Sequence, residues 1–389
     1  MKRKIVLIIQ RYGLEVNGGS EFYIRMVAER LTAYYEVEVL TTCAFDYTTW
    51  ENHYLPRLSE INGVKVRRFT VDRERDMRSF VNINLEMRCG YPSGEKWINA
   101  QGPYCPTLID YIRDNSDAYD VFIFATYLYY TTIRGLGLVK EKAILIPTAH
   151  DEEFLYYDIF KDIFSYPKAM LFLTEEEKNL VHNVFRNESI ISDVVGSGVD
   201  IPEGLFNNTT VQSFKMAHGL DEYLVYVGRI DDGKNCPELF DYFIEYKKRN
   251  PSDLKLCLVG SELISVPDNS DILSLGFVSD EDKLNCMAGA KLLVLPSLYE
   301  SLSLVILESM ALGIPVVVNG KCEVSKQHCI NSGGGLYYRD YYEFEGCINY
   351  LLQDDDIYND MSENAKCYIE KKYRWDVVME KFKRIIEIV

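Results

Sequence analysis

Short apolar runs alternate with amphipathic stretches through the first half of the chain. Apolar residues at helical spacing separate several of the runs, as between Glu21 and Ala33. Strands covered on both faces are nearly continuous in Val, Ile and Leu, and strands that alternate with helices form parallel sheets. The runs predict buried parallel strands at residues 4–9, 36–41, 64–69, 120–125, 142–147, 168–173 and 190–195. We therefore expect residues 1–195 to form one α/β domain.

A second pattern of the same kind follows a break. Residues 196–219 are rich in Gly, Asn and Thr and hold few periodic apolar residues, which predicts a linker. The alternation restarts within residues 220–375. The expected strands are 223–227, 254–259, 272–275, 291–295 and 315–318, and the expected helices are 236–249, 280–288 and 304–312. The tail, residues 376–389, has the apolar spacing of one more amphipathic helix.

The two patterns predict an α/β protein with two Rossmann-like, doubly wound domains. Two such domains joined by a hinge would face a cleft. In doubly wound sheets, ligands bind beyond the carboxyl ends of the strands. Residues that directly follow the predicted strands are therefore the first candidates for a functional site.

The charge balance restricts the classes of partner. The 389 residues include 59 Asp and Glu against 42 Lys and Arg, a formal net charge of −17. Proteins that bind nucleic acid through phosphate contacts need a basic face, so we expect no nucleic-acid partner. The first apolar run has five residues, fewer than the roughly seven of a signal-peptide core, and no apolar stretch reaches the roughly 18 residues of a membrane span. We expect a cytoplasmic protein.

Ten cysteines are scattered through the chain without a CxxC pair. We expect reduced thiols, as is usual in cytosolic proteins. The nearest approach to a metal-binding pattern is Cys322, His328 and Cys329, which lack a fourth ligand at a usual spacing. We therefore expect no metal site.

Two glycines, Gly18 and Gly19, precede the first predicted helix, and we expect Ser20 to cap it. Glycine allows a ligand to approach the backbone closely, and a helix N-terminus favours anions. The alternative is that the glycines serve turn geometry alone. Because no GxGxxG follows this strand and no Walker A motif occurs, neither a nicotinamide site nor a P-loop is indicated.

His150 follows the predicted strand 142–147 and would lie at a strand end, facing the cleft. The alternative is a loop histidine with hydrogen bonds of its own. The chain has five histidines and no cluster of them, so His150 does not indicate a metal.

Two cations flank the turn after the predicted strand 223–227. Arg229 and Lys234 are five residues apart across a turn that contains glycine, and Asn235 is expected to cap the next helix. Cations in this arrangement can bind a diphosphate without a metal. The alternative is a pair of solvated surface cations.

Residues 292–315 predict a strand, a loop, a helix with Ser303 as N-cap, and a helix stop. Glu300 and Glu308 are eight residues apart, and on one continuous helix they would diverge by about 80°. We expect Glu300 in the loop and Glu308 in the helix, in contact with different parts of one elongated ligand. The N–H groups at the helix start would bind a phosphate. Glu308, on a nearly apolar helix, needs a partner or a ligand, the alternative being a surface position.

Together these motifs resemble the GT-B glycosyltransferases, and specifically the retaining glycosyltransferase family 4. The resemblance covers most of the chain and is strongest between residues 223 and 320. It implies the GT-B fold, in which the C-terminal helix, here 376–389, crosses back to the first domain. The residues that carry it are Gly18-Gly19, His150-Asp151, Gly198-Val199-Asp200, Gly228-Arg229, Lys234-Asn235, Leu258-Val259-Gly260, Gly276-Phe277-Val278, Pro296-Ser297, Glu300 and Glu308.

The resemblance implies a metal-independent transfer of a sugar from a UDP- or GDP-sugar to a glycan or lipid-linked acceptor. It further implies retention of anomeric configuration, no cofactor, and a place in cell-surface polysaccharide or glycoconjugate biosynthesis. The resemblance implies that Arg229 and Lys234 hold the diphosphate and that the amides of Ser303 and Leu304 support its distal phosphate. It implies that Glu308 contacts the ribose and that the Val278 backbone faces the base. It also implies that Glu300 and His150 contact the donor sugar and that Gly18 and Gly19 close over the phosphates.

The chain departs from the family at Ser301 and Ser303, where glycine is frequent. This departure puts the donor preference in question. Two other functions stay open on the same architecture. One is a catalytically idle glycosyltransferase-like subunit that binds a partner, and the other is a sugar-nucleotide epimerase.

The segment 71–101 shows no family pattern and is expected to be a loop. Residues 65–88 are a stretch of mixed charge, with Tyr91 and Trp97 nearby. The stretch is expected to be either a solvated loop or a peripheral contact with anionic lipid at the inner face of a membrane.

Overall fold

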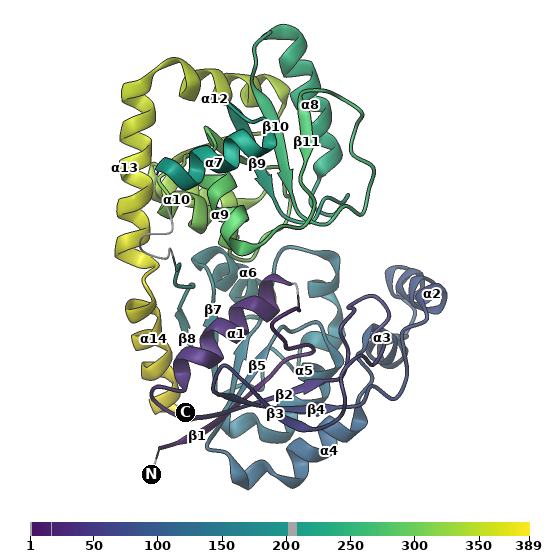
Figure 1. The fold of residues 1–389 in the computed structure, drawn as a ribbon. Helices are drawn as coiled ribbons and strands as arrows, with labels where there is room; N and C mark the ends of the chain where they lie inside the picture. The colour runs from purple at the N-terminus through teal and green to yellow at the C-terminus, as the bar shows by residue number, and fades with distance from the viewer. Residues whose placement is uncertain (1, 17, 201–207) are drawn as a thin grey trace. The chain divides into compact units, whose positions relative to one another are not determined.

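The computed structural model describes residues 2–16, 18–200 and 208–389. The chain folds as two compact units (Figure 1). Unit 1 consists of Met1–Val195 and Met379–Val389, and unit 2 consists of Gly196–Val378. Each unit is built on a sheet of its own, which confirms the predicted α/β fold class with two sheets.

Unit 1 contains an eight-stranded sheet in the order β3-β4-β2-β1-β5-β6-β7-β8. Neighbouring strands are parallel, except that β3 pairs antiparallel with β4 at one edge. The strands are β1 (Lys4–Ile8), β2 (Glu36–Thr42), β3 (Leu58–Ile61), β4 (Val64–Phe69), β5 (Val121–Ala125), β6 (Ala143–Ile146), β7 (Ala169–Phe172) and β8 (Ile191–Val194).

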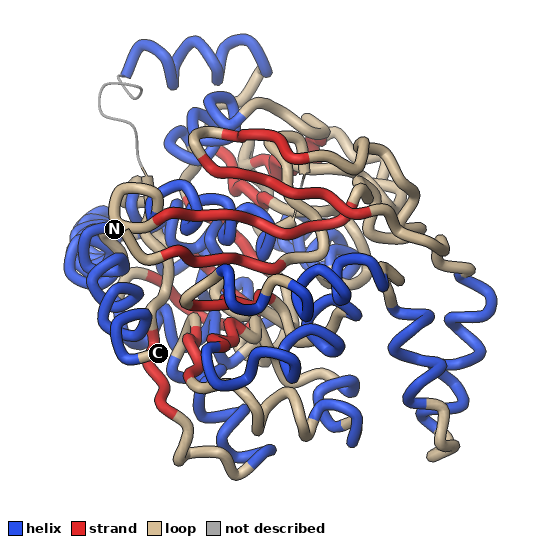
Figure 2. The backbone as a smooth tube through the Cα atoms, turned by 90° about the horizontal axis from the view of Figure 1, so that it is seen from below, coloured by secondary structure: helices blue, strands red, loops and turns tan. Residues whose placement is uncertain are grey.

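Both faces of the unit 1 sheet are covered by helices (Figures 1 and 2). In β1, Val6 and Ile8 belong to a core that includes Leu108 of α4. The alternate residues Ile5 and Leu7 point to the opposite face and are equally buried. The helices of this unit are α1 (Gly19–Leu31), α2 (Met77–Arg88), α3 (Gly94–Gln101), α4 (Pro106–Asp114), α5 (Tyr130–Gly135) and α6 (Glu175–Phe185).

The expectation of a loop at residues 71–101 was wrong. Helices α2 and α3 lie in this segment, pack against each other and extend from the side of unit 1 (Figures 1 and 2). The stretch 65–88 likewise contains most of β4 and all of α2. The helical pattern of α2 is weak in the sequence because Phe80 is its one buried side chain.

Unit 2 contains a six-stranded, wholly parallel sheet in the order β11-β10-β9-β12-β13-β14. Its strands are β9 (Tyr223–Val227), β10 (Lys255–Val259), β11 (Ile272–Ser274), β12 (Leu292–Leu295), β13 (Val316–Asn319) and β14 (Gly335–Tyr338). Its helices are α7 (Asn208–His218), α8 (Cys236–Arg249), α9 (Asp280–Gly289), α10 (Leu304–Ala311), α11 (Glu323–Ser332), α12 (Tyr341–Gln353) and α13 (Asp355–Lys372).

The prediction of a linker over residues 196–219 was wrong for its second half. Residues 208–218 form α7, which packs against α9 within unit 2. Phe214 is buried, whereas Met216 is 82% exposed. Because so few positions are both apolar and buried, the sequence of α7 shows little helical periodicity. A helix that is stabilised by tertiary packing can therefore resemble a linker in sequence. Residues 201–207 of the predicted linker lie outside the described part of the chain.

The last helix, α14 (Trp375–Ile388), begins in unit 2, and its residues from Met379 onward belong to unit 1. There Phe382 and Ile386 are fully buried, and Lys381 Nζ donates to the Val194 carbonyl at 2.8 Å. Among the described residues, no helix has the length and apolar character that a membrane crossing requires.

Gly260 directly follows β10 at the carboxyl edge of the unit 2 sheet, with a φ of 145°. A Cβ here would lie 1.9 Å from the carbonyl oxygen of Gly228, which follows β9. Backbone cannot yield as a flexible side chain does, so we expect Gly260→Ala to lower the free energy of unfolding by about 3 kcal/mol or more. The matched control is Gly346→Ala in α12, where a Cβ meets nothing within 4 Å.

We expect the control to raise stability by about 0.5–1 kcal/mol, because alanine favours a helix over glycine. Chemical denaturation of the two variants measures both changes. Equal stabilities of the two variants would contradict this account of the carboxyl edge.

Candidate functional site

The carboxyl edge of the unit 2 sheet brings Lys234 and Glu300 together. Lys234 follows β9 and Glu300 follows β12, the strand that pairs with β9. The Lys234 ammonium donates to Glu300 Oε1 at 2.7 Å, with side chains that are 27% and 12% exposed. The Lys234 backbone N–H donates to Asp231 Oδ1 at 2.7 Å, which fixes the turn that carries the lysine. A half-buried ion pair thus lies where parallel sheets bind ligands.

Arg229, the second predicted cation, starts the same turn. Its guanidinium Nη1 lies 3.5 Å from Asp231 Oδ2, and its side chain is 47% exposed. Its carbonyl accepts a hydrogen bond from the Tyr226 hydroxyl at 2.5 Å. Asp231 therefore contacts both the Arg229 side chain and the Lys234 backbone, and it links the two predicted cations.

Glu308 lies within α10 and has a partner that the sequence reasoning missed. Lys283 of α9 donates from Nζ to Glu308 Oε1 at 2.9 Å, and the two side chains are 19% and 17% exposed. Burial raises the pKa of the Glu308 carboxyl, and the Lys283 ammonium opposes that rise. The partner was hard to find because it lies 25 residues away in the sequence on another helix. The available signal was a single lysine in the acidic first turns of α9.

Ser303 occupies the N-cap position of α10, but its side chain does not cap the helix. Its backbone is left-handed, with φ 62° and ψ 75°, whereas a capping side chain requires an extended backbone. The Ser303 Oγ and the Ser297 Oγ are buried and have no hydrogen-bond partner among the described residues. The first N–H groups of α10, beginning with that of Leu304, have no partner within the helix. Two unpaired hydroxyls and a helix N-terminus therefore lie within seven residues of one another.

Asn235 is also an N-cap residue without a capping side-chain bond, again because its φ is positive, at 58°. Its amide instead donates to Glu238 Oε1 at 2.9 Å and to the Pro296 carbonyl at 3.2 Å. Asn319, at the end of β13, donates to the same Glu238 oxygen at 2.9 Å. This network ties the start of α8 to the ends of β12 and β13 and stabilises the turn that bears Lys234.

The metal pattern noted in the sequence does not form a cluster. His328 has both ring nitrogens in hydrogen-bonding contact, with the Leu302 carbonyl at 2.8 Å and the Tyr368 hydroxyl at 3.1 Å. Cys322 accepts from Ser325, and Cys329 donates to the Leu336 carbonyl. Within the described ranges, no three His, Cys, Asp or Glu side chains come together in a way that could hold a metal ion.

Val278 lies between β11 and α9 at the same edge of the unit 2 sheet and is half-buried. Its neighbour Phe277 is 68% exposed. Gly276, which precedes both, has a φ of 65° and accepts from the Gly260 N–H at 2.8 Å. This hydrogen bond holds the backbone two residues before Val278, which the resemblance assigns to the base.

The other predicted residues belong to unit 1. His150 follows β6, and its Nδ1 lies 3.5 Å from Glu152 Oε1. The buried Glu177 accepts from the Ala149 and Leu173 N–H groups at 2.7 Å each, so the loop bearing His150 is tied to the end of β7. Sequence reasoning missed both carboxylates.

Gly18 is the N-cap residue of α1, and Gly19 is its first helical residue. A Cβ on Gly18 would lie 2.2 Å from the carboxylate of Glu21, which forms a buried ion pair with Arg11 at 2.6 Å. Ser20 does not cap the helix as expected. The helix already begins at Gly19, and the Ser20 hydroxyl donates to Glu21 Oε2 at 2.9 Å.

The geometry of unit 2 agrees with a comparison of sequences. Residues 211–367 match the family model described as glycosyl transferases group 1. These residues contain Arg229, Lys234, Glu300, Glu308 and the whole of α10. The chain is also 22% identical, over 99% of its own length and 98% of the other, to an uncharacterized glycosyltransferase of Methanocaldococcus jannaschii.

Solved glycosyltransferases share the fold over almost the whole chain. Sucrose-phosphate synthase from Thermosynechococcus elongatus is 17% identical, with a TM-score of 0.73 over 99% of this chain and 98% of the other. HepE from Anabaena, solved with UDP and glucose, is 14% identical, with a TM-score of 0.71 over all of both chains. The chain therefore has the GT-B fold that the resemblance implied.

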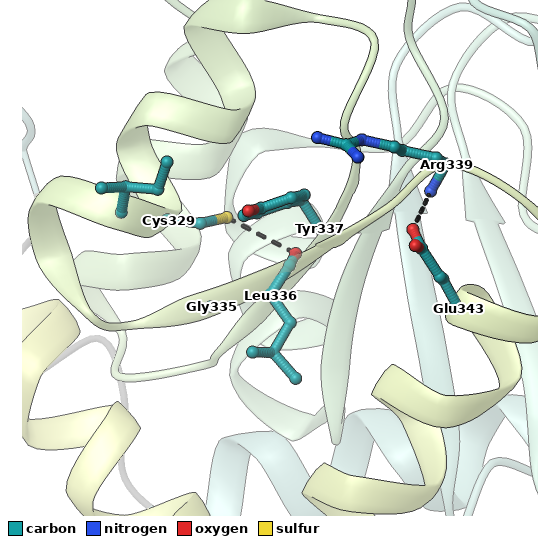
Figure 3. A pocket seen from close by; sticks show the side chains of 7 residues that line it. Cys329, Gly335, Leu336, Tyr337, Arg339 and Glu343 are labelled. Atoms are coloured by element: carbon teal, nitrogen blue, oxygen red, sulfur yellow. Dashed lines mark hydrogen bonds between the residues drawn. The ribbon is translucent and has the colours of Figure 1, made fainter.

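A pocket of about 400 Å³ lies elsewhere in unit 2, at the edge strand β14 (Figure 3). It is lined by Cys329, Ile330, Gly335, Leu336, Tyr337, Arg339 and Glu343. The Arg339 N–H donates to Glu343 Oε2 at 2.7 Å. None of the residues singled out from the sequence as donor contacts lines this pocket.

Proposed function

We propose that the chain is a glycosyltransferase that uses a UDP- or GDP-sugar as its donor. One observation carries the proposal. The Lys234–Glu300 pair lies at the carboxyl edge of the unit 2 sheet, and the unpaired Ser297 and Ser303 hydroxyls belong to the loop between β12 and α10. Buried polar groups without partners are costly in a folded protein. A bound diphosphate would accept hydrogen bonds from both hydroxyls.

The chemistry of sugar transfer fits these groups. Breaking the anomeric C–O bond of the donor leaves negative charge on the departing diphosphate. The Lys234 ammonium has three N–H donors, of which one is used by Glu300, and the others can donate to phosphate oxygens. The N-terminus of α10 adds about half a positive charge. Fixed donors of this kind stabilise developing charge without a metal, and the proposed reaction is metal-independent.

The remaining contacts with the donor follow from the resemblance. Glu308 would accept from the ribose hydroxyls, Arg229 would bind the diphosphate, and Glu300 would contact the donor sugar. His150, Gly18 and Gly19 of unit 1 are proposed to act on the same donor. We propose a glycan or a lipid-linked sugar as the acceptor and retention of anomeric configuration in the product. The complex of HepE with UDP and glucose supports a UDP-sugar as the first donor to test.

A panel of nucleotide sugars tests this function. Melting temperatures of the purified chain would be measured with UDP- and GDP-sugars and with the free nucleotides, and mass spectrometry would follow the products. We expect the nucleotides of one base, uracil or guanine, to raise the melting temperature. We expect the sugar of the matching nucleotide sugar to be transferred to an acceptor. Binding without transfer would favour an idle subunit, and conversion of the donor alone would favour an epimerase. No stabilisation by any nucleotide would contradict the proposal.

A further inference from the structure

The loop between β12 and α10, residues 296–303, carries Glu300 and leads into the strained residue Ser303. A positive φ costs a residue other than glycine about 1–2 kcal/mol. At Ser303, with φ 62°, something must hold this conformation. The side chain of Ser303 does not, because its hydroxyl has no hydrogen-bond partner among the described residues.

His328 of α11, outside the loop, makes a hydrogen bond that can stabilise this backbone conformation. Its Nε2 lies 2.8 Å from the Leu302 carbonyl oxygen, and both residues are 3% exposed. A carbonyl oxygen can only accept, so Nε2 carries the proton. Burial lowers the pKa of His328 to about 4, so the ring is neutral at neutral pH and Nδ1 is an acceptor.

The second ring nitrogen fixes this tautomer. Nδ1 accepts from the Tyr368 hydroxyl at 3.1 Å, and that hydroxyl in turn accepts from the Tyr373 hydroxyl at 3.1 Å. Both tyrosines are less than 10% exposed. The hydrogen bonds therefore run in one direction, from Tyr373 through Tyr368 and His328 to the loop.

The Leu302 carbonyl and the Ser303 N–H belong to one peptide unit. Because a trans peptide is planar, its C=O and N–H point in opposite directions. A carbonyl held toward His328 aims the Ser303 N–H away from His328. If the peptide turned over, Ser303 would leave its strained conformation, and a carbonyl oxygen would replace the N–H on that side.

We propose that His328 is a positioning residue that holds the Leu302–Ser303 peptide so that the Ser303 N–H points at the distal phosphate of the donor's diphosphate. This rests on the proposed function, since the phosphate belongs to the nucleotide sugar. His328 does not touch the donor, and it acts through the peptide that it holds.

Calorimetric titration of His328→Leu with a nucleoside diphosphate and with the matching monophosphate tests the proposal. We expect the affinity for the diphosphate to fall about 10-fold or more, the usual effect of losing one hydrogen bond to a charged group, while the monophosphate binds as before. His328→Gln, whose amide can still donate to Leu302, is expected to keep most of the affinity. Equal losses for both nucleotides, or no loss, would overturn the proposal.

Ser303→Gly provides the matched background. Glycine adopts φ 62° without strain, so holding the peptide matters less there. We expect His328→Leu to cost less diphosphate affinity in Ser303→Gly than in the wild-type chain. An equal or larger cost would contradict the role of strain.

A crystal structure of His328→Leu separates this inference from the proposed function. We expect the Leu302–Ser303 peptide to turn over and the Ser303 φ to become negative, whether or not any nucleotide binds. If His328→Leu does not fold, Tyr368→Phe removes the donor to Nδ1 instead, and it is expected to give a smaller loss of diphosphate preference. An unchanged peptide in His328→Leu, or an unchanged preference in Tyr368→Phe, would overturn the proposal.

Discussion

Replacing Lys234 with alanine is expected to lower turnover about 10²–10³-fold, equivalent to about 3 kcal/mol of transition-state stabilisation. The physical reason is that the Lys234 ammonium is proposed to donate to the diphosphate as its charge develops. The ammonium nitrogen lies 2.7 Å from Glu300 Oε1 at the carboxyl edge of the unit 2 sheet. Initial rates with a saturating nucleotide sugar, together with the melting temperature of the variant, measure the effect.

The matched control for Lys234→Ala is Lys291→Ala. Lys291 also forms an ion pair, with Glu222 at 2.9 Å, but it precedes β12 and so lies at the amino edge of the same sheet. We expect its removal to leave turnover within about twofold of wild type, because exposed ion pairs contribute little. Comparable turnover of the Lys234 and Lys291 variants would refute the role assigned to Lys234.

Replacing Glu308 with glutamine is expected to weaken nucleotide binding about 10–100-fold. The Glu308 carboxylate is proposed to accept from the ribose hydroxyls, and hydrogen bonds to a charged group contribute about 1.5–3 kcal/mol each. Titration with a ribonucleotide and with its 2′,3′-dideoxy analogue separates this contact from a structural effect. The wild-type chain should prefer the ribonucleotide strongly, and Glu308→Gln should discriminate much less.

Glu345→Gln is the matched control for the Glu308 variant. Glu345 is 13% exposed, against 17% for Glu308, and pairs with Arg249 at 3.0 Å in the same unit. We expect this variant to keep the ribonucleotide preference of the wild-type chain. Loss of that preference in both variants, or in neither, would argue against a ribose contact at Glu308.

The pH dependence of nucleotide binding should follow the ionisation of Glu308. Burial raises the pKa of Glu308, Lys283 opposes the rise, and Asp280 adds to it. As the pH falls through this raised pKa, Glu308 gains a proton and loses the charge that attracts the hydroxyls. We therefore expect the advantage of the wild-type chain over Glu308→Gln to shrink on acidification, beginning at a higher pH than for an ordinary glutamate. An advantage that does not change with pH would contradict this assignment.

The sequence predicted elements well where burial is complete. β9 and α8 begin and end at the predicted residues 223–227 and 236–249, because apolar runs and helical spacing set them locally. Prediction failed for α2, which buries Phe80 alone, and for α7, which extends into a polar stretch. In both helices, packing against a neighbouring helix stabilises residues whose own pattern is weak.

The candidate site divides in a similar way. Residue types and strand ends were sufficient to select Lys234, Glu300 and Glu308. The contacts that support the site were not predictable. Lys283 pairs with Glu308 from 25 residues away, and His328 contacts the Leu302 carbonyl from 26 residues away, each from a helix of its own. The left-handed backbone of Ser303 and Asn235 was also missed, because a side chain that can cap a helix does not reveal its φ.

The most direct test of the central claim is a crystal structure of the chain with a bound nucleoside diphosphate. We expect phosphate oxygens within about 3 Å of Lys234 Nζ and of the Ser303 N–H, and the ribose hydroxyls on Glu308. A diphosphate bound away from the carboxyl edge of the unit 2 sheet, without contact to Lys234 or Glu300, would contradict the account.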